Sequence, residues 1–390
     1  GYSERASNID DLNIPNPLKK KIANQQNKDY WISGSILNHQ DGYCITTELY
    51  DAKLGKLLQK REFIEDNIFI IPGFIDLHCH GGNGYDTMEG WGSIEKMASY
   101  HLSRGTTTLL ATTWTSTPNH TFEALKGFNK NISADSNLIG VHLEGPFINP
   151  NKLGAQPALT QKPSKEFIEE IKKIADIKVI TLAPELDGME EFVNYLNQNN
   201  IKVQFGHTLA DYNCCKKFMD QFNIGFTHLY NAMSGNDHRN PGVLSAALQN
   251  SQYAEIICDL LHVDEQAIKI AKKCIPGLYA ITDSIGAAGL KDGNYKFANI
   301  EIEKKKEKVT LKNSSTLAGS VANMHTTFLN LLNIQYSIEE AVSMTSYNAS
   351  QYLKLDNIGL IKEGMKSNFI LLDKNHNIIN VYLNGKKIDR

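Results

Sequence analysis

Residues 72–82 read PGFIDLHCHGG, an apolar run that predicts a buried strand and ends in two histidines separated by one residue. Because side chains alternate between the two faces of a strand, His78 and His80 point to one side and Cys79 points away. Two imidazoles directed at one point are typical of a metal site. A lone His-x-His pair is weak evidence, so the metal interpretation depends on the other strands.

Seven further apolar, β-rich runs follow this stretch and alternate with amphipathic helical segments. The eight predicted strands cover residues 68–80, 106–114, 138–147, 177–184, 201–207, 224–233, 254–262 and 278–286. Eight βα units in succession predict an α/β fold, a closed (β/α)8 TIM-like barrel. The active site of such a barrel lies at the C-terminal ends of its strands.

The flanks of the barrel have a different pattern, and three regions are predicted. Residues 1–28 are expected to be a loosely ordered extension, and residues 71–358 the catalytic barrel. Strand-like pieces in 29–70 and 359–390 predict a small β-sandwich domain that both ends of the chain build together. Lysine and glutamate alternate in 301–312, which predicts a hairpin with one solvated face.

Composition excludes several classes of partner. The 390 residues have a formal net charge of −3 and so create no basic field for nucleic acid or an anionic membrane. No run of about 20 apolar residues predicts a spanning helix. Six cysteines without a CxxC pair indicate free thiols, and the first 29 residues lack an apolar signal core. We therefore expect a reduced, cytoplasmic protein.

Residues of metal-ligand or acid–base type recur where the predicted strands end. They are His78 and His80 on the first strand, Glu144 on the third, His207 on the fifth, His228 on the sixth, His262 on the seventh and Asp283 on the eighth. Seven such placements by chance are improbable, which favours a catalytic centre. His142 fits a core histidine at least as well as a residue that lines the barrel. The remaining candidates, His39, His101, His120, His325 and His376, are interpreted as surface or packing residues.

Further segments are HLEGPF (142–147), GHT (206–208), HLYNAM (228–233), HRNPG (238–242), TDSIGAAG (282–289) and TLAGS (316–320). Together with residues 72–82 they resemble the amidohydrolase superfamily of metal-dependent hydrolases, and specifically its N-acetylglucosamine-6-phosphate deacetylases, from about residue 70 to 388. The resemblance implies a homodimer that removes the acetyl group of a sugar phosphate in amino-sugar catabolism.

The resemblance also implies roles for individual residues. Glu144, His207 and His228 would hold the principal metal, and His78 and His80 a second one with Glu144 bridging. Relatives without these two histidines use one ion, so one or two ions, Zn²⁺ or Fe²⁺, are expected. The residues implied to contact the sugar phosphate are Ala155, Gln156, Asn231, Ala232, Arg239, His262, Leu317, Ala318 and Gly319.

Three positions depart from the family pattern. Gln156 replaces a histidine that in many relatives is thought to polarise the acetyl carbonyl. Leu260 stands where a glycine commonly follows the aspartate, and His325 stands where an aspartate is usual. The first departure concerns the chemistry, and the other two concern packing and the shape of the sugar pocket.

An amide is a poor electrophile, so its hydrolysis needs a nucleophile activated by a metal and a proton carrier. Asp283 is the expected general base and later general acid, and the guanidinium of Arg239 matches phosphate oxygens. The alternatives are an N-acetylgalactosamine-6-phosphate deacetylase, another amidohydrolase such as a cyclic amidase or nucleobase deaminase, or a noncatalytic scaffold. The first alternative stays open because the sequence does not distinguish the two epimers.

Overall fold

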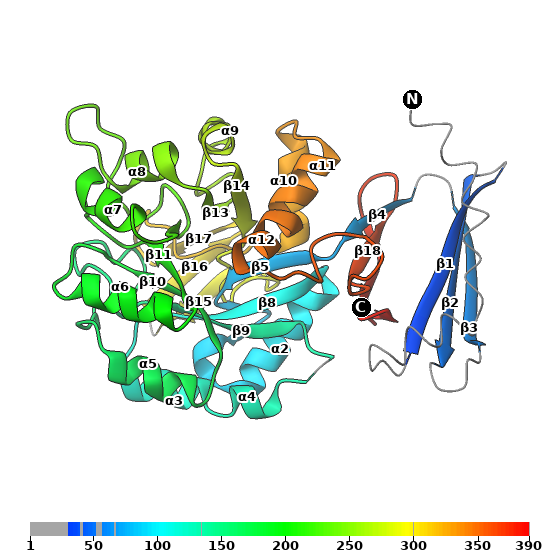
Figure 1. The fold of residues 1–390 in the computed structure, drawn as a ribbon, viewed down its shortest axis with the longest axis horizontal. Helices are drawn as coiled ribbons and strands as arrows, with labels where there is room; N and C mark the ends of the chain where they lie inside the picture. Colours follow the sequence, from blue (N-terminus) through cyan, green and yellow to red (C-terminus); the bar gives the residue numbers. More distant parts are fainter. Residues whose placement is uncertain are drawn as a thin grey trace. The chain divides into compact units, whose positions relative to one another are not determined.

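The computed structural model describes residues 30–39, 42–51, 57–65, 68–133, 135–298 and 300–389, with only the backbone in the first three ranges. The predicted extension 1–28 lies outside the described residues. The chain divides into two compact units (Figure 1). The first boundary follows Phe69, and the short segment Leu372–Asn377 belongs to the same unit as Phe69.

The larger unit contains the predicted barrel. Six parallel strands pair in the order β12-β11-β10-β9-β8-β5, and β13 pairs with β14. Their bounds are β5 Phe74–Cys79, β8 Thr106–Thr113, β9 Leu138–Glu144, β10 Ile177–Leu182, β11 Lys202–Phe205, β12 Gly225–Phe226, β13 Tyr253–Ile257 and β14 Gly277–Ile281.

Backbone contacts close the two ends of this sheet into a ring. The amide of Leu229, just after β12, donates to the carbonyl of Glu255 on β13 over 2.8 Å. On the other side, the amide of Asp283 donates to the carbonyl of His78 over 2.9 Å, and Cys79 bridges to Ser284. The predicted eight-stranded barrel is thereby confirmed.

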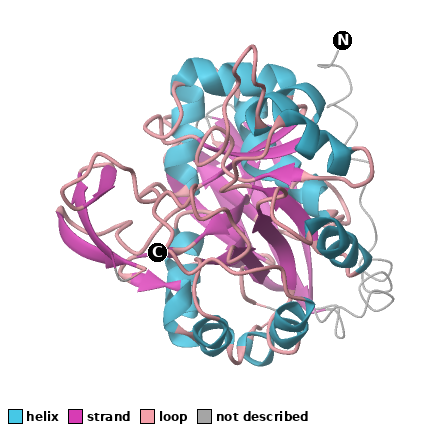
Figure 2. Ribbon diagram, turned by 90° about the vertical axis from the view of Figure 1, so that its left-hand side faces the viewer, coloured by secondary structure: helices cyan, strands magenta, loops and turns pink. Residues whose placement is uncertain are grey.

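Helices surround the barrel strands (Figure 2) because most carry an apolar stripe at helical spacing and begin at a capping residue. In α6, Met189, Phe192, Val193 and Leu196 form the buried face, and α11 begins with a capping box between Ser337 and Glu340. The α-helices are α2 Trp91–Ser103, α3 Pro118–Leu125, α4 Phe128–Asn131, α5 Lys165–Lys172, α6 Met189–Gln198, α7 Tyr212–Met219, α8 Val243–Asn250, α9 Glu265–Cys274, α10 Met324–Asn333, α11 Ile338–Val342 and α12 Asn348–Leu353. A 3₁₀-helix, η2 Thr87–Glu89, and a π-helix, η3 Ser343–Tyr347, accompany them.

The first predicted strand is wrong in extent, because it breaks at Gly73. Residues before the break form β4 (Phe69–Pro72), which lies in a separate sheet of order β20-β19-β18-β4. The other strands of that sheet are β18 Phe369–Leu372, β19 Ile378–Leu383 and β20 Lys386–Lys387. A Cβ on Gly73 would lie only 2.1 Å from Thr107 Oγ1, so the close passage of the two chains at this break requires glycine.

The N-terminal strands β1 Tyr30–His39, β2 Gly42–Asp51 and β3 Leu57–Glu65 form an antiparallel sheet of their own. The joining of both chain ends into one β-sandwich stays a prediction, although β4 and β18 already bring them into one sheet. The predicted charged hairpin is confirmed as β16 Ile300–Lys305 and β17 Lys308–Leu311, which pair with β15 Gly293–Phe297. A two-residue pair, β6 Gly81–Gly82 and β7 Tyr85–Asp86, follows β5.

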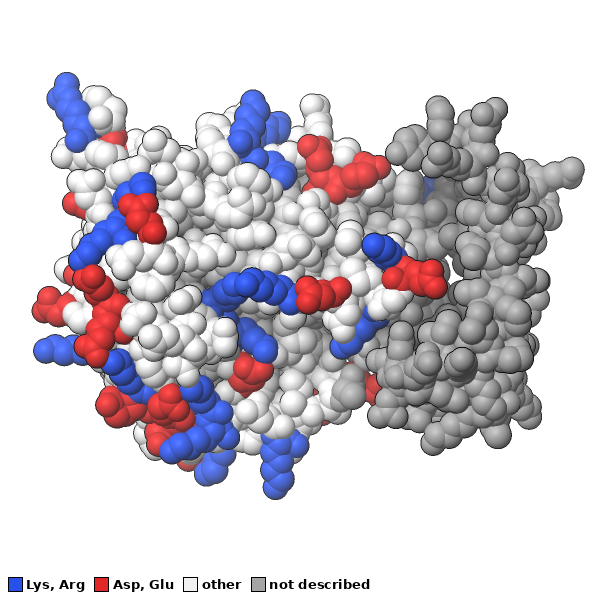
Figure 3. Space-filling view, in the orientation of Figure 1, with Lys and Arg blue, Asp and Glu red and all other residues white. Residues whose placement is uncertain are grey.

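The described surface and helices agree with the charge pattern of the sequence. Basic and acidic side chains are interspersed over the face shown in Figure 3, without a continuous basic area. Among the described residues, no helix is long and apolar enough to cross a bilayer.

Candidate metal centre and substrate pocket

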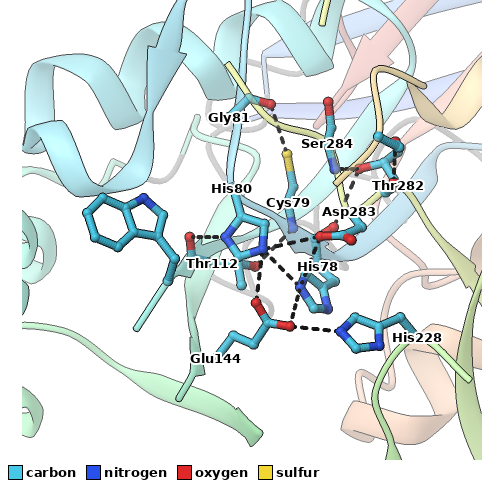
Figure 4. Close-up of polar contacts among 12 residues, drawn as sticks. His78, Cys79, His80, Gly81, Thr112, Glu144, His228, Thr282, Asp283 and Ser284 are labelled. Carbon is cyan, nitrogen blue, oxygen red and sulfur yellow. Dashed lines mark hydrogen bonds and ion pairs between the residues drawn. The ribbon is translucent and has the colours of Figure 1, made fainter. Parts of the chain in front are cut away.

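Six predicted site residues meet at the C-terminal ends of the barrel strands. Figure 4 shows five of them, His78, His80, Glu144, His228 and Asp283. His78 and Glu144 lie on β5 and β9, and His80 directly follows β5. His207, His228 and Asp283 each lie two residues beyond their strands, β11, β12 and β14. The predicted strands therefore extended too far, because the backbone leaves the extended conformation before it reaches the site.

These last three residues have left-handed backbone conformations. The φ angles are 50° at His207, 28° at His228 and 50° at Asp283. Such angles are unfavourable for residues with a Cβ and are found mainly where function requires them. Here the turn redirects each side chain from the strand end into the mouth of the barrel.

One cluster consists of Glu144, His207 and His228, the predicted principal ligands. Glu144 Oε1 lies 3.0 Å from His207 Nε2 and 2.9 Å from His228 Nε2, and the two Nε2 atoms are 3.1 Å apart. All three residues are buried. The structure thus brings the predicted ligand atoms within the reach of a single ion.

A second cluster consists of His78, His80 and Asp283, with Glu144 between the two clusters. The Nε2 atoms of His78 and His80 are 3.2 Å apart and lie 3.4 and 3.2 Å from Asp283 Oδ1. Glu144 Oε2 lies 3.2 Å from His80 Nε2. Glu144 Oε1 also lies 3.5 Å from His78 Nε2, so the carboxylate contacts both clusters, as a bridging ligand does.

The ring orientations fit a cation. His80 Nδ1 lies 3.2 Å from the carbonyl oxygen of Thr112, and His207 Nδ1 lies 2.9 Å from that of Lys152. A carbonyl only accepts, so both Nδ1 atoms donate these hydrogen bonds, and both Nε2 atoms are directed into the cluster. Imidazole nitrogens and carboxylate oxygens that converge in this way suit Zn²⁺ or Fe²⁺.

The carboxylates of the centre are held in their charged form. Burial would raise the pKa of Glu144, but the charges of His78 and His207 and the hydrogen bonds from His207 and His228 hold it well below its ordinary value. Burial opposes ionisation of Asp283 too, yet the hydrogen bond from His80 and the charge of His78 lower its pKa to about 2. Asp283 is therefore a carboxylate, the form that a general base requires.

A cavity of about 410 Å³ opens directly over both clusters. Of the predicted substrate residues, those that line it are Ala155, Gln156, Asn231, Ala232, His262, Leu317 and Gly319. Lys152 and Phe297 line it as well, and Phe297 comes from the β15–β17 insertion. The predicted loops thus converge on one pocket.

Two predicted substrate residues do not line this cavity. Ala318 is fully buried in an apolar cluster with Ile285 and Phe297, so its side chain packs the loop. Arg239 lies on an exposed loop in which Asp237 Oδ1 accepts from its backbone amide. Arg239 therefore does not line the cavity of its own chain, and its contact with the sugar phosphate stays a prediction.

Gln156 is held between two partners. Its Oε1 accepts from the amide of Thr115 over 2.6 Å, and its Nε2 donates to Glu144 Oε2. The side chain is 7% exposed. The amide nitrogen of Gln156, which replaces the histidine of the family pattern, is thus directed at the carboxylate of Glu144.

His262 reaches the cavity from a loop, because the seventh strand ends at Ile257 and not at His262 as predicted. Its Nδ1 lies 2.7 Å from Asp259 Oδ2, and Asp259 Oδ1 accepts the amides of Leu261 and His262. Burial would lower the pKa of His262, but the hydrogen bond and charge of Asp259 raise it. Asp259, which was not predicted, fixes this ring.

The turn between Asp259 and His262 gives a test of backbone strain. Leu260 has a φ of 62°, at the position where relatives commonly carry glycine. We expect Leu260→Gly to be more stable than Leu260→Ala by roughly 1 kcal/mol, because only glycine adopts this conformation without strain. Chemical denaturation of both variants measures the difference, and equal stabilities would show that the turn is unstrained.

The sequence interpretation missed Glu255 as well. This fully buried carboxylate lies on β13 with Oε2 at 2.9 Å from His78 Nδ1. The sequence feature that could have identified Glu255 is that it is the single charged residue in the apolar run 253–258.

The structure also places two other histidines. His142 is a core residue, hydrogen bonded to the carbonyl of Leu77 and to Thr181, and His101 is buried against Cys79.

Comparison with known proteins agrees with this geometry. The model of the amidohydrolase family matches residues 69–388. N-acetylglucosamine-6-phosphate deacetylase of Bacillus subtilis (strain 168) is 34% identical over 325 residues, which cover 80% of this chain and 82% of the relative. N-acetylgalactosamine-6-phosphate deacetylase of Escherichia coli O157:H7 is 28% identical over 82% of this chain and 88% of the relative. The crystal structure of N-acetylglucosamine-6-phosphate deacetylase from Thermotoga maritima superposes with a TM-score of 0.79 at 31% identity, covering 92% of this chain and 100% of that one.

Proposed function

This chain belongs to the amidohydrolase family, among its N-acetylglucosamine-6-phosphate deacetylases, and we propose that it hydrolyses the acetamide of N-acetyl-D-glucosamine 6-phosphate to glucosamine 6-phosphate and acetate. The observation that carries the proposal is the convergence of Glu144, His207, His228 and Asp283 at the floor of one cavity. The free thiols among the described cysteines support the reducing cytoplasm as its compartment.

Glu144, His207 and His228 would hold the principal cation, and His78 and His80 would hold a second one, with Glu144 between them. A divalent cation there supplies the Lewis acidity that makes water a sufficient nucleophile for an amide near neutral pH. Gln156 restrains the carboxylate of Glu144 from the side of the pocket.

Asp283 would move the proton in both halves of the reaction. Its carboxylate is ionised and its side chain is 13% exposed, so it can be reached from the cavity. It takes a proton from the attacking water as the oxygen bonds to the acetyl carbon. It then gives that proton to the sugar nitrogen as the carbon–nitrogen bond breaks, so that the amine leaves neutral.

The sugar would lie along the loops that line the upper part of the cavity. His262 is fixed by Asp259 and presents its Nε2 edge for a hydrogen bond with the sugar phosphate. Asn231 and the loop at Leu317 and Gly319 complete the wall. These contacts would orient the acetamide toward the ligand cluster, and correct orientation is itself a large part of catalysis.

We infer a homodimer in which Arg239, which lies outside the cavity of its own chain, reaches the phosphate bound by the other subunit. We expect Arg239→Ala to raise KM for the 6-phosphorylated sugar roughly ten- to a hundred-fold, through loss of a charge-assisted contact worth about 1.5–3 kcal/mol. Turnover of unphosphorylated N-acetylglucosamine should stay unchanged. Arg104→Ala, on a residue that does not line the cavity, is the control, and equal losses for both sugars would remove Arg239 from phosphate recognition.

A panel of N-acetylhexosamine 6-phosphates with amine release as the readout tests the proposed reaction. We expect kcat/KM to be highest for the glucosamine derivative, because the glucosamine relative is the more similar of the two. A higher value for the galactosamine epimer would transfer the assignment to the second activity. Release of no amine from either sugar by metal-loaded protein would contradict the deacetylase assignment.

A further inference from the structure

Glu255 is a charged residue that the proposed reaction does not use. It is 0% exposed and lies on the interior of the barrel, beneath the ligand clusters. Its Oε2 lies 2.9 Å from His78 Nδ1 and accepts the backbone amide of His228 over 3.4 Å. A single carboxylate thus contacts one residue from each of the two ligand clusters.

A chain of hydrogen bonds runs around the barrel floor and holds this carboxylate in place. His142 Nε2 lies 2.8 Å from Thr181 Oγ1, which lies 2.7 Å from Thr227 Oγ1. Thr227 donates to Gln204 over 2.9 Å, and Gln204 donates to the hydroxyl of Tyr279 over 2.7 Å. The Tyr279 hydroxyl in turn donates to Glu255 Oε1 over 3.5 Å. Such a network fixes the orientation of its members.

The charge of Glu255 has no ordinary cation to balance it. Within the described part of the chain, its ion-pair partners are two histidines, His78 at 2.9 Å and His142 at 4.0 Å. A buried carboxylate without a positive partner costs several kcal/mol. A cation held by the imidazole of His78 would offset this cost.

His78 is also the one imidazole of the two clusters whose Nδ1 contacts a carboxylate. Nδ1 of His80 and of His207 contacts a neutral carbonyl, and that of His228 has no hydrogen-bond partner among the described residues. A carboxylate behind a ligand histidine fixes its tautomer and strengthens its free nitrogen as a ligand. The contact therefore singles out the His78–His80 cluster.

We propose that Glu255 is a positioning residue that holds His78 as a ligand and thereby lets the His78–His80–Asp283 cluster retain a second divalent cation. The inference rests on the metal centre of the proposed function but not on the identity of the substrate. It assigns the chain two ions, and it makes occupancy of the second ion depend on a residue that contacts neither ion nor substrate.

Metal binding without substrate tests this proposal. Metal-free protein is titrated with Co²⁺ against a competing chelator, which gives the number of ions and both affinities. We expect two ions in the wild type, and in Glu255→Gln a second-site affinity lower by roughly ten- to a hundred-fold with the first site unchanged. The variant His78→Gln/His80→Asn provides the one-ion reference.

Tyr279→Phe is the matched control, because it removes a member of the same buried network and leaves the Glu255–His78 contact in place. It should retain two ions with affinities close to those of the wild type. If it weakened the second site as much as Glu255→Gln does, packing of the barrel floor would be responsible and the proposal would be wrong.

Further outcomes separate the proposal from its alternatives. One ion in the wild type, or an unchanged second site in Glu255→Gln, overturns it, and neither result affects the deacetylase assay. Thermal unfolding of the metal-free proteins reports whether Glu255→Gln folds. If it does not, Glu255→Asp, which withdraws the carboxylate from Nδ1 by one methylene, should weaken the second site selectively, and an unchanged second site there overturns the proposal as well.

Discussion

Replacement of Asp283 by asparagine should lower kcat by roughly 10²- to 10⁴-fold, the loss typical of a missing general acid–base. Asparagine keeps the size of the side chain but neither accepts a proton from water nor returns one to the sugar nitrogen. Single-turnover measurements on metal-loaded protein give the loss in the chemical step. Metal analysis of the same sample should find the principal ion retained, because Glu144, His207 and His228 hold it without Asp283.

Gln156 provides the comparison that makes this result specific. Gln156→Ala should cost clearly less than Asp283→Asn, because the amide restrains Glu144 and moves no proton. Gln156→His should be tolerated, since an imidazole can also donate to that carboxylate. A loss in Gln156→Ala as deep as that in Asp283→Asn would reverse this ranking and make the amide an essential electrophilic group.

The second large effect is expected at the principal ligands. His207→Ala or His228→Ala should remove most of the bound metal and, with it, nearly all deacetylation, because each removes one of three protein ligands around the same ion. Metal content by elemental analysis and amine release should fall together. His120→Ala, on a residue that does not line the cavity, should retain both.

Near-normal activity in either ligand variant would refute the assignment of this cluster. A loss of activity with full metal content would instead mean that the missing imidazole acts directly on the substrate. The two measurements therefore have to be made on the same preparation.

The barrel and its ligands could be predicted because they follow from local patterns. Strand periodicity and the alternation with helices specify eight βα units, and the barrel then places every strand end at one rim. That rule selects Glu144, His207, His228 and Asp283 among its candidates, and the resemblance to the deacetylase family assigned the first three to the principal metal. These residues could be placed at one rim from the order of the strands, without knowledge of contacts between distant segments.

The features that sequence reasoning missed depend on contacts between distant segments. Glu255 is separated from His78 by 177 residues, and nothing in the run 253–258 indicates which side chain its carboxylate meets. The break at Gly73 depends on Thr107 in the neighbouring strand. The motif around Arg239 predicted a role in substrate binding, but it did not indicate that the loop lies outside the cavity of its own chain.

The left-handed backbone at His207, His228 and Asp283 has a consequence for attempts to engineer this enzyme. Each of these residues carries a strain of roughly 1–2 kcal/mol, and together they amount to a sizeable part of the net stability of a typical domain, about 5–15 kcal/mol. A selection for heat resistance without a catalytic readout would therefore favour glycine at these three positions and yield a robust but inert barrel. Libraries for thermostability should keep the three positions fixed and seek their gains elsewhere, such as at Leu260, where the same relief leaves the ligands untouched.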